Sequence, residues 1–85
     1  MRAILHKKFQ KQLKKYPSLK EQTERRIILF VTDPHHPTLN DHALAGKWDG
    51  YRSINITGDY RAVYRIVEND SAYFVDLDTH SNLYE

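Results

Sequence analysis

The chain has no cysteine, only three glycines and three prolines, and no long apolar run. Without cysteine there is no disulfide and no thiolate nucleophile, so any chemistry must come from histidine, tyrosine, carboxylates or cations. No stretch reaches the roughly 18 to 20 apolar residues of a membrane helix, and the opening Met1 to Leu5 is followed by charge, unlike a signal peptide. We therefore expect a cytoplasmic protein that contacts no membrane.

The length and the placement of charge limit what the chain can be. A chain of 85 residues supports one hydrophobic core, so we expect a single domain over residues 1–85. Residues 1–30 hold nine basic and two acidic residues, a net charge of +7, and the remainder holds four basic and nine acidic residues, a net charge of −5. This split favours a basic face that meets a polyanion or an acidic partner, although lysine-rich helices also occur simply for solubility.

The first half of the chain shows helical periodicity. Phe9, Leu13 and Tyr16 stand at i, i+4 and i+7 with lysines between them, which predicts an amphipathic helix. A second helix should begin near Ser18 and end at Asp33-Pro34. A loop then follows as far as residue 47. The two helices are expected to pack against each other as an antiparallel pair.

The second half is typical of strands. Residues 51–57, 60–67 and 72–77 are rich in β-branched and aromatic side chains and are separated by short turns. Such strands form an antiparallel meander, to which the N-terminal residues could add an edge strand. The expected fold class is α+β, with two N-terminal helices packed on a small antiparallel sheet of three to four strands.

The alternation of side chains suggests which residues the helices cover. In the first strand, Ile54 and Ile56 should face the helices, leaving Asn55 on the open face. In the third strand, Tyr73, Val75 and Leu77 are interpreted as covered, and Phe74, Asp76 and Asp78 as open. The middle strand is ambiguous, because Arg61 shares a face with Val63 and Tyr60 shares one with Tyr64.

The open face collects residues that can act on RNA. It should carry Asn55 next to the loop with His42 and the C-terminal residues His80 and Tyr84. A histidine titrates near neutral pH and can take the proton of a ribose 2′-hydroxyl, which then attacks the adjacent phosphate without a metal or other cofactor. For either histidine alone, a surface or capping role is the simpler interpretation.

Cations and rings beside these histidines could hold the substrate. Arg61, Arg52 and Lys47 are candidates for phosphate binding, and Tyr60 is a candidate for stacking on a base. The simpler interpretation is that the cations are solvated surface charges and that the tyrosine packs at the edge of the sheet.

The histidines between residues 33 and 42 raise the alternative of a metal site. His35, His36 and His42 lie in one loop with Asp33 and Asp41, but the spacing matches no zinc pattern, and adjacent histidines seldom reach one ion. The sequence therefore predicts no metal and no bound cofactor.

Four segments carry a resemblance to a known family: residues 9–15 (FQKQLKK), 41–52 (DHALAGKWDGYR), 58–64 (GDYRAVY) and 78–84 (DTHSNLY). In order and separation, they are similar to the RelE/YafQ superfamily of toxins from bacterial toxin-antitoxin pairs. The resemblance covers nearly the whole chain. It implies helices on an antiparallel sheet, ribosome-dependent cleavage of messenger RNA and neutralisation by an antitoxin protein.

The resemblance also implies site residues. His42, Asp59 and His80 match functional positions of the YafQ branch, and Arg61 matches a phosphate-contacting arginine of the RelE branch. Tyr84 matches an aromatic position used in both. The hypothesis is thus a ribonuclease in which His42 or His80 is the base, the other histidine or Tyr84 is the acid, and Arg61 stabilises the pentavalent phosphate. Asp59, in a tight turn, fits an orienting role better than that of a base.

The chain departs from the YafQ branch at three positions. Asn55 stands in place of a histidine, Asp76 in place of an arginine and Tyr60 in place of a tryptophan. An asparagine cannot act as a base, and a carboxylate repels phosphate. Two alternatives therefore stay open: a toxin without nuclease activity that resembles the ParE branch acting on DNA gyrase, and a weakened toxin that mainly binds its antitoxin.

Overall fold

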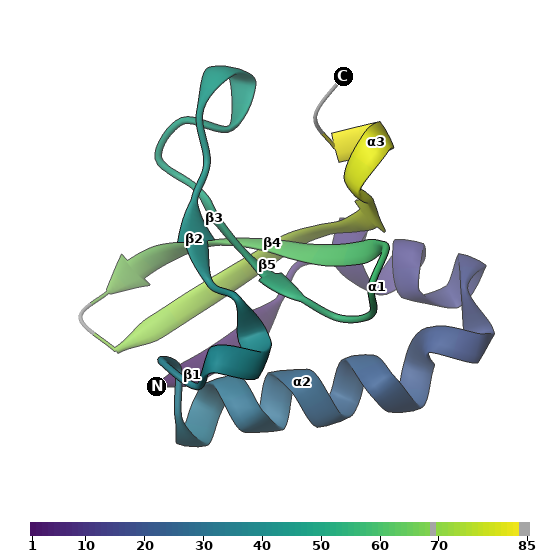
Figure 1. Ribbon diagram of the computed structural model, residues 1–85, viewed down its shortest axis with the longest axis horizontal. Helices are drawn as coiled ribbons and strands as arrows, with labels where there is room; N and C mark the ends of the chain where they lie inside the picture. The colour runs from purple at the N-terminus through teal and green to yellow at the C-terminus, as the bar shows by residue number, and fades with distance from the viewer. Residues whose placement is uncertain (69, 84–85) are drawn as a thin grey trace.

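The computed structural model describes residues 1–68 and 70–83 and shows helices packed on one mixed β-sheet (Figure 1). The elements follow in the order β1 (Arg2–Leu5), α1 (Lys7–Lys15), α2 (Lys20–Thr32), β2 (His42–Ala43), β3 (Arg52–Asn55), β4 (Tyr60–Glu68), β5 (Ser71–Thr79) and α3 (His80–Leu83). Three single 3₁₀ turns lie between them, at Pro17–Leu19, Pro37–Leu39 and Gly46–Trp48. The expected α+β class is confirmed.

Among the residues that the structure describes, the sheet has five strands in the order β1-β5-β4-β3-β2, where three to four were expected. The pairs β2–β3, β3–β4 and β4–β5 are antiparallel, but β1 runs parallel to β5, so the expectation of an antiparallel sheet was wrong at this edge. The N-terminal strand itself was expected. Strand β2 was missed because two residues are too few to show a period of two.

Aromatic side chains fill the space between the helices and the sheet. The ring of Phe30 from α2 lies 4.9 Å from Tyr64 of β4 and 5.4 Å from Phe74 of β5, and Phe9 of α1 lies 5.7 Å from Phe74. All four rings are almost fully buried. Helix α2 runs beneath the sheet in Figure 1. Burial of four rings makes this layer the main source of apolar stabilisation.

A bulge in β5 reverses part of the expected face assignment. Val63 pairs with Asp76 and Tyr64 pairs with Phe74, so Val75 has no partner of its own on β4. The extra residue shifts the alternation, and Phe74 and Leu77 both reach the core although they stand three residues apart. The assignment of Leu77 was right, whereas those of Tyr73, Phe74 and Val75 were wrong. Ile54 of β3 and Ile56, just after this strand, lie in the core as expected.

Each of the two N-terminal helices packs more closely against the sheet than against the other helix. Helix α1 packs mainly along β5, and α2 contacts β1 and the turn before it. Helix α2 begins at Lys20, two residues later than expected, because Pro17 starts a 3₁₀ turn first. The C-terminal helix α3 was not predicted. No helix in residues 1–68 and 70–83 is long and apolar enough to cross a membrane.

A second apolar cluster lies on the opposite side of the sheet. Leu44, Val63 and Leu83 are buried there, with Trp48 and Tyr51 packed against them. The indole Nε1 of Trp48 donates to the carbonyl oxygen of Leu83 at 2.8 Å. This contact ties the loop between β2 and β3 to α3. It thereby fixes the two segments that carry His42 and His80.

Candidate functional site

The side of the sheet that carries the second cluster is called the open face here, and Arg61 of β4 lies on it, paired with Asn55 on one side and Asp78 on the other. The guanidinium donates from Nε to the hydroxyl of Ser53 at 2.8 Å, and from Nη2 to the carbonyl oxygens of Asn40 at 2.9 Å and Ser53 at 3.2 Å. Only 6% of Arg61 is exposed. Its charge therefore lies just beneath the surface instead of projecting from it.

His42 lies directly on this guanidinium. Its Nδ1 is 3.3 Å from Nη2 of Arg61 and 2.9 Å from the carbonyl oxygen of Asn40. A carbonyl oxygen can only accept, so the shorter contact assigns the proton of the neutral ring to Nδ1. The other ring nitrogen, Nε2, then carries the free lone pair. Because His42 is an exposed residue, that lone pair is available to a substrate.

Asn40 provides the carbonyl oxygen that holds both groups. Its backbone is left-handed, with φ of 44°, and follows the 3₁₀ turn Pro37–Leu39. Asparagine tolerates this conformation better than most residues. The left-handed turn directs the carbonyl oxygen toward Arg61 and His42, so Asn40 is a positioning residue that sequence reasoning missed.

Asp41 holds the same segment from the other side of the sheet. Its carboxylate accepts from Nε of Arg52 at 3.1 Å and from the hydroxyl of Tyr64. Burial, followed by the hydrogen bond to Asp41, raises the pKa of Tyr64 far above its usual value. Burial alone acts to lower the pKa of Arg52, but the charge of Asp41 raises it overall. This trio anchors β2 and with it the position of His42.

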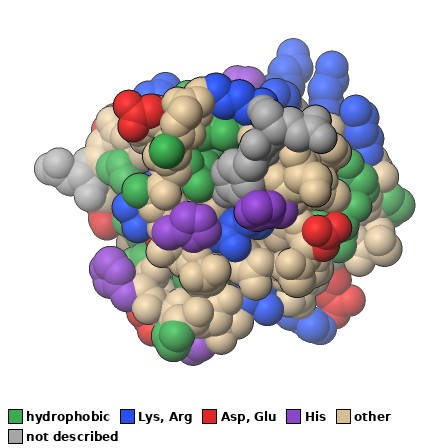
Figure 2. Space-filling model, turned by 45° about the horizontal axis from the view of Figure 1, so that its top comes forward, with side chains coloured by type: hydrophobic (Ala, Val, Ile, Leu, Met, Phe, Trp, Pro, Cys, Tyr) green, Lys and Arg blue, Asp and Glu red, His purple; other side chains and the backbone are tan. Residues whose placement is uncertain are grey.

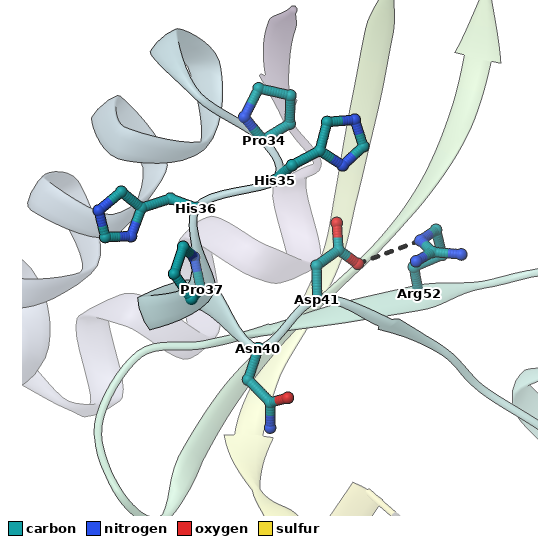
Figure 3. Close-up of a pocket in the computed structure, with 7 residues that line it drawn as sticks. All are labelled: Pro34, His35, His36, Pro37, Asn40, Asp41 and Arg52. Atoms are coloured by element: carbon teal, nitrogen blue, oxygen red, sulfur yellow. Dashed lines mark hydrogen bonds and ion pairs between the residues drawn. The ribbon is translucent and has the colours of Figure 1, made fainter.

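Figure 3 shows the hollow beside this anchor, with Asp41 and Arg52 joined by their ion pair and His36 directed away from both. The hollow is about 330 Å³ and is also lined by Pro34, His35 and Asn40. Arg52 shares the face of Tyr64, its partner across the strands, and so lies on the opposite face from Arg61. The structure does not bring the two arginines together. In residues 1–68 and 70–83, no three His, Asp or Glu side chains are arranged to hold a metal ion.

The remaining histidine candidate begins α3. The backbone N–H of His80 donates to the carbonyl oxygen of Asp59 at 2.9 Å, which places the start of α3 beside the turn between β3 and β4. His80 and Asp59 are both exposed. Asn55 is half-buried on the open face. Figure 2 turns this face forward and shows histidine side chains beside a Lys or Arg side chain near its middle.

Two other expected RNA contacts lie away from Arg61. The ring of Tyr60 packs 5.0 Å from Tyr16 and shares the face of the aromatic core, so it is not part of the open face. Lys47 is exposed in the loop between β2 and β3, where it lines a hollow with Lys8. Tyr84, the remaining predicted catalytic residue, lies outside the described residues.

The two aspartates of β5 line the same hollow as Lys8 and Lys47, and each has hydrogen-bond partners within the chain. Asp76 is 7% exposed and contacts Nζ of Lys8 at 3.3 Å and Nε2 of Gln12 at 3.4 Å. Asp78 accepts from Asn82 and from the hydroxyl of Tyr16. Burial acts to raise the pKa of Asp78, but these hydrogen bonds outweigh it and lower the pKa. The repulsion expected from Asp76 is therefore countered by Lys8.

The sequence profile of the family described as "Bacterial toxin of type II toxin-antitoxin system, YafQ" matches residues 1–85. The chain belongs to this family. A Haemophilus influenzae protein named as a YafQ toxin is 46% identical over 44 residues, which covers 48% of this chain and 43% of that protein, less than half of its length.

Solved structures agree with the family assignment. A copper-bound mutant toxin from Helicobacter pylori is 31% identical, with a TM-score of 0.78 and 99% of each chain covered. YafQ in the DinJ–YafQ complex of E. coli is 22% identical, with a TM-score of 0.80 and 100% of each chain covered. The second likeness shows the fold alone. The resemblance recognised from residues 9–15, 41–52, 58–64 and 78–84 is thus confirmed.

Proposed function

We propose that this YafQ-family chain is a ribosome-dependent endoribonuclease that cleaves messenger RNA and thereby inhibits translation. The observation that carries the proposal is the arrangement of His42, an exposed residue whose Nδ1 contacts the carbonyl oxygen of Asn40 at 2.9 Å and lies 3.3 Å from Nη2 of Arg61. That is the geometry of a general base next to a site of developing negative charge.

The proposed reaction uses the substrate's own nucleophile. Nε2 of His42 takes the proton of a ribose 2′-hydroxyl, and the oxygen attacks the adjacent phosphorus. The bond from phosphorus to the 5′-oxygen breaks, and His80 or Tyr84 returns a proton to that oxygen. The products are a 2′,3′-cyclic phosphate and a 5′-hydroxyl. Arg61 stabilises the extra charge of the pentavalent phosphate from beneath the surface.

Arg61 has less freedom than the sequence suggested. A two-pronged grip on phosphate needs two adjacent donors, and the contacts to Ser53 and Asn40 already use Nε and Nη2. None of the hydrogen bonds between residues that the structure describes uses Nη1. Arg61 is therefore proposed to act by its charge and by holding the residue 40–42 segment. Its effect on His42 makes it both an electrostatic and a positioning group.

The test is primer extension on messenger RNA in a cell-free translation reaction. His42→Ala should lower cleavage by about 100-fold or more, the usual contribution of a general base. His35→Ala removes an exposed histidine elsewhere in the same loop region and should cut like the wild type. Arg61→Lys keeps the charge but cannot make the same three hydrogen bonds, so it should cut more slowly. Undiminished cleavage by the folded His42→Ala protein would overturn the assignment.

A parallel gyrase supercoiling assay separates the second functional class. The ribonuclease proposal predicts cut messenger and unaffected supercoiling. Inhibited supercoiling with intact messenger would instead place the chain with toxins that act on gyrase. Toxicity on overexpression with neither effect would exclude both targets.

A protein antitoxin is the proposed partner. The E. coli relative was solved in complex with DinJ, and the surplus of positive charge in residues 1–30 here suits an acidic partner. Co-expression with a short acidic protein encoded beside the toxin should restore growth and yield a complex that elutes as one species. Persistent growth arrest with both proteins present would contradict this pairing.

A further inference from the structure

A hollow of about 310 Å³ lies on the open face, away from His42, and none of its lining residues takes part in the proposed reaction. It is lined by Arg65 of β4 and Tyr73 of β5, which pair across the strands. His6 and Lys8 at the start of α1, Trp48 and Tyr51 of the loop between β2 and β3, and Val75 of β5 also line it. These seven residues define the Trp48 groove.

The groove combines half-exposed rings with cations. The ring of His6 meets that of Tyr73 edge to face at 5.2 Å, and Trp48 meets Tyr51 in the same way at 5.3 Å. The guanidinium of Arg65 lies 5.7 Å from the centre of the Tyr73 ring. No carboxylate lines the groove itself, although Asp76 beside it partly neutralises Lys8. Arg65 is therefore its main source of positive charge.

Hydrogen bonds hold two side chains of the groove, which shares strand β4 with Arg61 of the candidate site. The hydrogen bond from Trp48 to Leu83 fixes the indole, and His6 is held as the N-cap of α1, its Nδ1 accepting from the N–H of Lys8 at 3.0 Å. Along β4, Arg61 and Arg65 share the open face four residues apart. At about 3.3 Å per residue they are roughly 13 Å apart, a span of a few nucleotides.

We infer that the Trp48 groove binds unpaired bases and backbone phosphate of the messenger next to the bond that is cut. Single-stranded RNA is recognised by rings on which bases stack and by cations that follow its backbone, which is the content of this groove. The inference rests on the proposed function, because the groove is assigned to another part of the same messenger RNA that the candidate site is proposed to cleave. A protein helix would instead require an aliphatic stripe, and among the residues that line the groove Val75 alone is aliphatic.

Binding is measured by fluorescence anisotropy of a labelled 12-nucleotide RNA carrying 2′-O-methyl groups, so that it cannot be cleaved. Tyr73→Leu should weaken binding at least about fivefold, the lower end of one base-on-ring stack, while Tyr73→Phe should bind like the wild type. Arg65→Gln should reduce the slope of log affinity against log salt by about 0.7, the value for one phosphate contact on a single strand.

Arg25→Gln is the matched control, because Arg25 is an exposed arginine on α2 whose partner is Glu21. It should keep the wild-type affinity and salt slope. Equal binding by wild type, Tyr73→Leu and Arg65→Gln, or no RNA binding by the wild type, would overturn the groove assignment. Loss of antitoxin binding with unchanged RNA binding in these variants would overturn it too, and would assign the groove to the antitoxin.

The outcome is separable from that of the proposed function. His42→Ala should retain RNA affinity and lose cleavage. If the wild type binds RNA through the groove but cuts no messenger on the ribosome, the nuclease proposal fails and the groove stands. If His42 is required for cleavage and the groove variants bind and cleave normally, the groove inference fails alone.

Discussion

The hydroxyl of Tyr64 should be worth far more to stability than an ordinary tyrosine hydroxyl. It donates to Asp41, whose side chain is 14% exposed and which also binds Arg52. A hydrogen bond to a charged group contributes about 1.5 to 3 kcal/mol. Tyr64→Phe should therefore lower the free energy of unfolding by about 2 kcal/mol, which in a domain of this size lowers the melting temperature by roughly 8 to 16 °C.

The pH dependence of this difference provides a second, independent test. Burial raises the pKa of Tyr64 in the folded protein, whereas an unfolded tyrosine loses its proton near pH 10. A group whose folded pKa is raised stabilises the fold below the unfolded pKa, and this contribution is lost as the pH rises toward the folded value. The stability gap between wild type and Tyr64→Phe should thus be constant up to about pH 10 and shrink above it.

Urea unfolding followed by circular dichroism at pH 7, 9, 10.5 and 11.5 measures both effects. Tyr51→Phe is the control, because no hydrogen bond of the Tyr51 hydroxyl occurs among the described residues, and its stability should change by less than about 0.5 kcal/mol. The reasoning fails if the two variants are equally stable at pH 7. It also fails if the gap for Tyr64→Phe stays unchanged through pH 11.5.

Three further changes test other parts of the structure by the same urea measurement. Asn40→Ala should lower the free energy of unfolding by about 1 kcal/mol, because the left-handed backbone at this position disfavours a side chain that cannot form local hydrogen bonds. Asn40→Gly should leave the stability nearly unchanged. Equal losses in the two variants would argue against a conformational cause. Thr23→Val should stabilise the fold by about 1 kcal/mol, since Thr23 Oγ1 is buried without a partner in the described part of the chain; a loss of stability would reveal a hidden contact. The lowered pKa of Asp78 means that its contribution is complete above the unfolded value near 3.9 and is lost as the pH falls through the folded value. Asp78→Asn should accordingly show a shallower fall in stability below about pH 5 than the wild type, and parallel curves would refute the assignment.

Local patterns predicted the elements well because the information lies within a few residues. The spacing of Phe9 and Leu13 marked α1, and the alternation around Ile54 marked the covered face of β3. The bulge at Val75 could not be predicted in this way, because it depends on how β5 pairs with β4. A single extra residue moved Phe74 from the open face to the core.

The candidate site was predictable only in part, for the same reason. The family resemblance pointed to His42 and Arg61, and the structure brings them into contact. It could not show that Arg61 is nearly buried, because that burial comes from the residue 40–42 segment closing over it. Nor did any sequence signal single out Tyr64, since its role depends on a hydrogen bond to Asp41, which lies 23 residues earlier in the chain.

The parallel pairing of β1 with β5 has a consequence for how the chain acquires its shape. Residues 2–5 and 71–74 form adjacent strands although most of the chain separates them, and contacts of this range form slowly. During synthesis, α1 has no surface to cover until β5 emerges. The sheet can therefore be completed only after residues 71–79 have been synthesised, because β5 lies between β1 and β4.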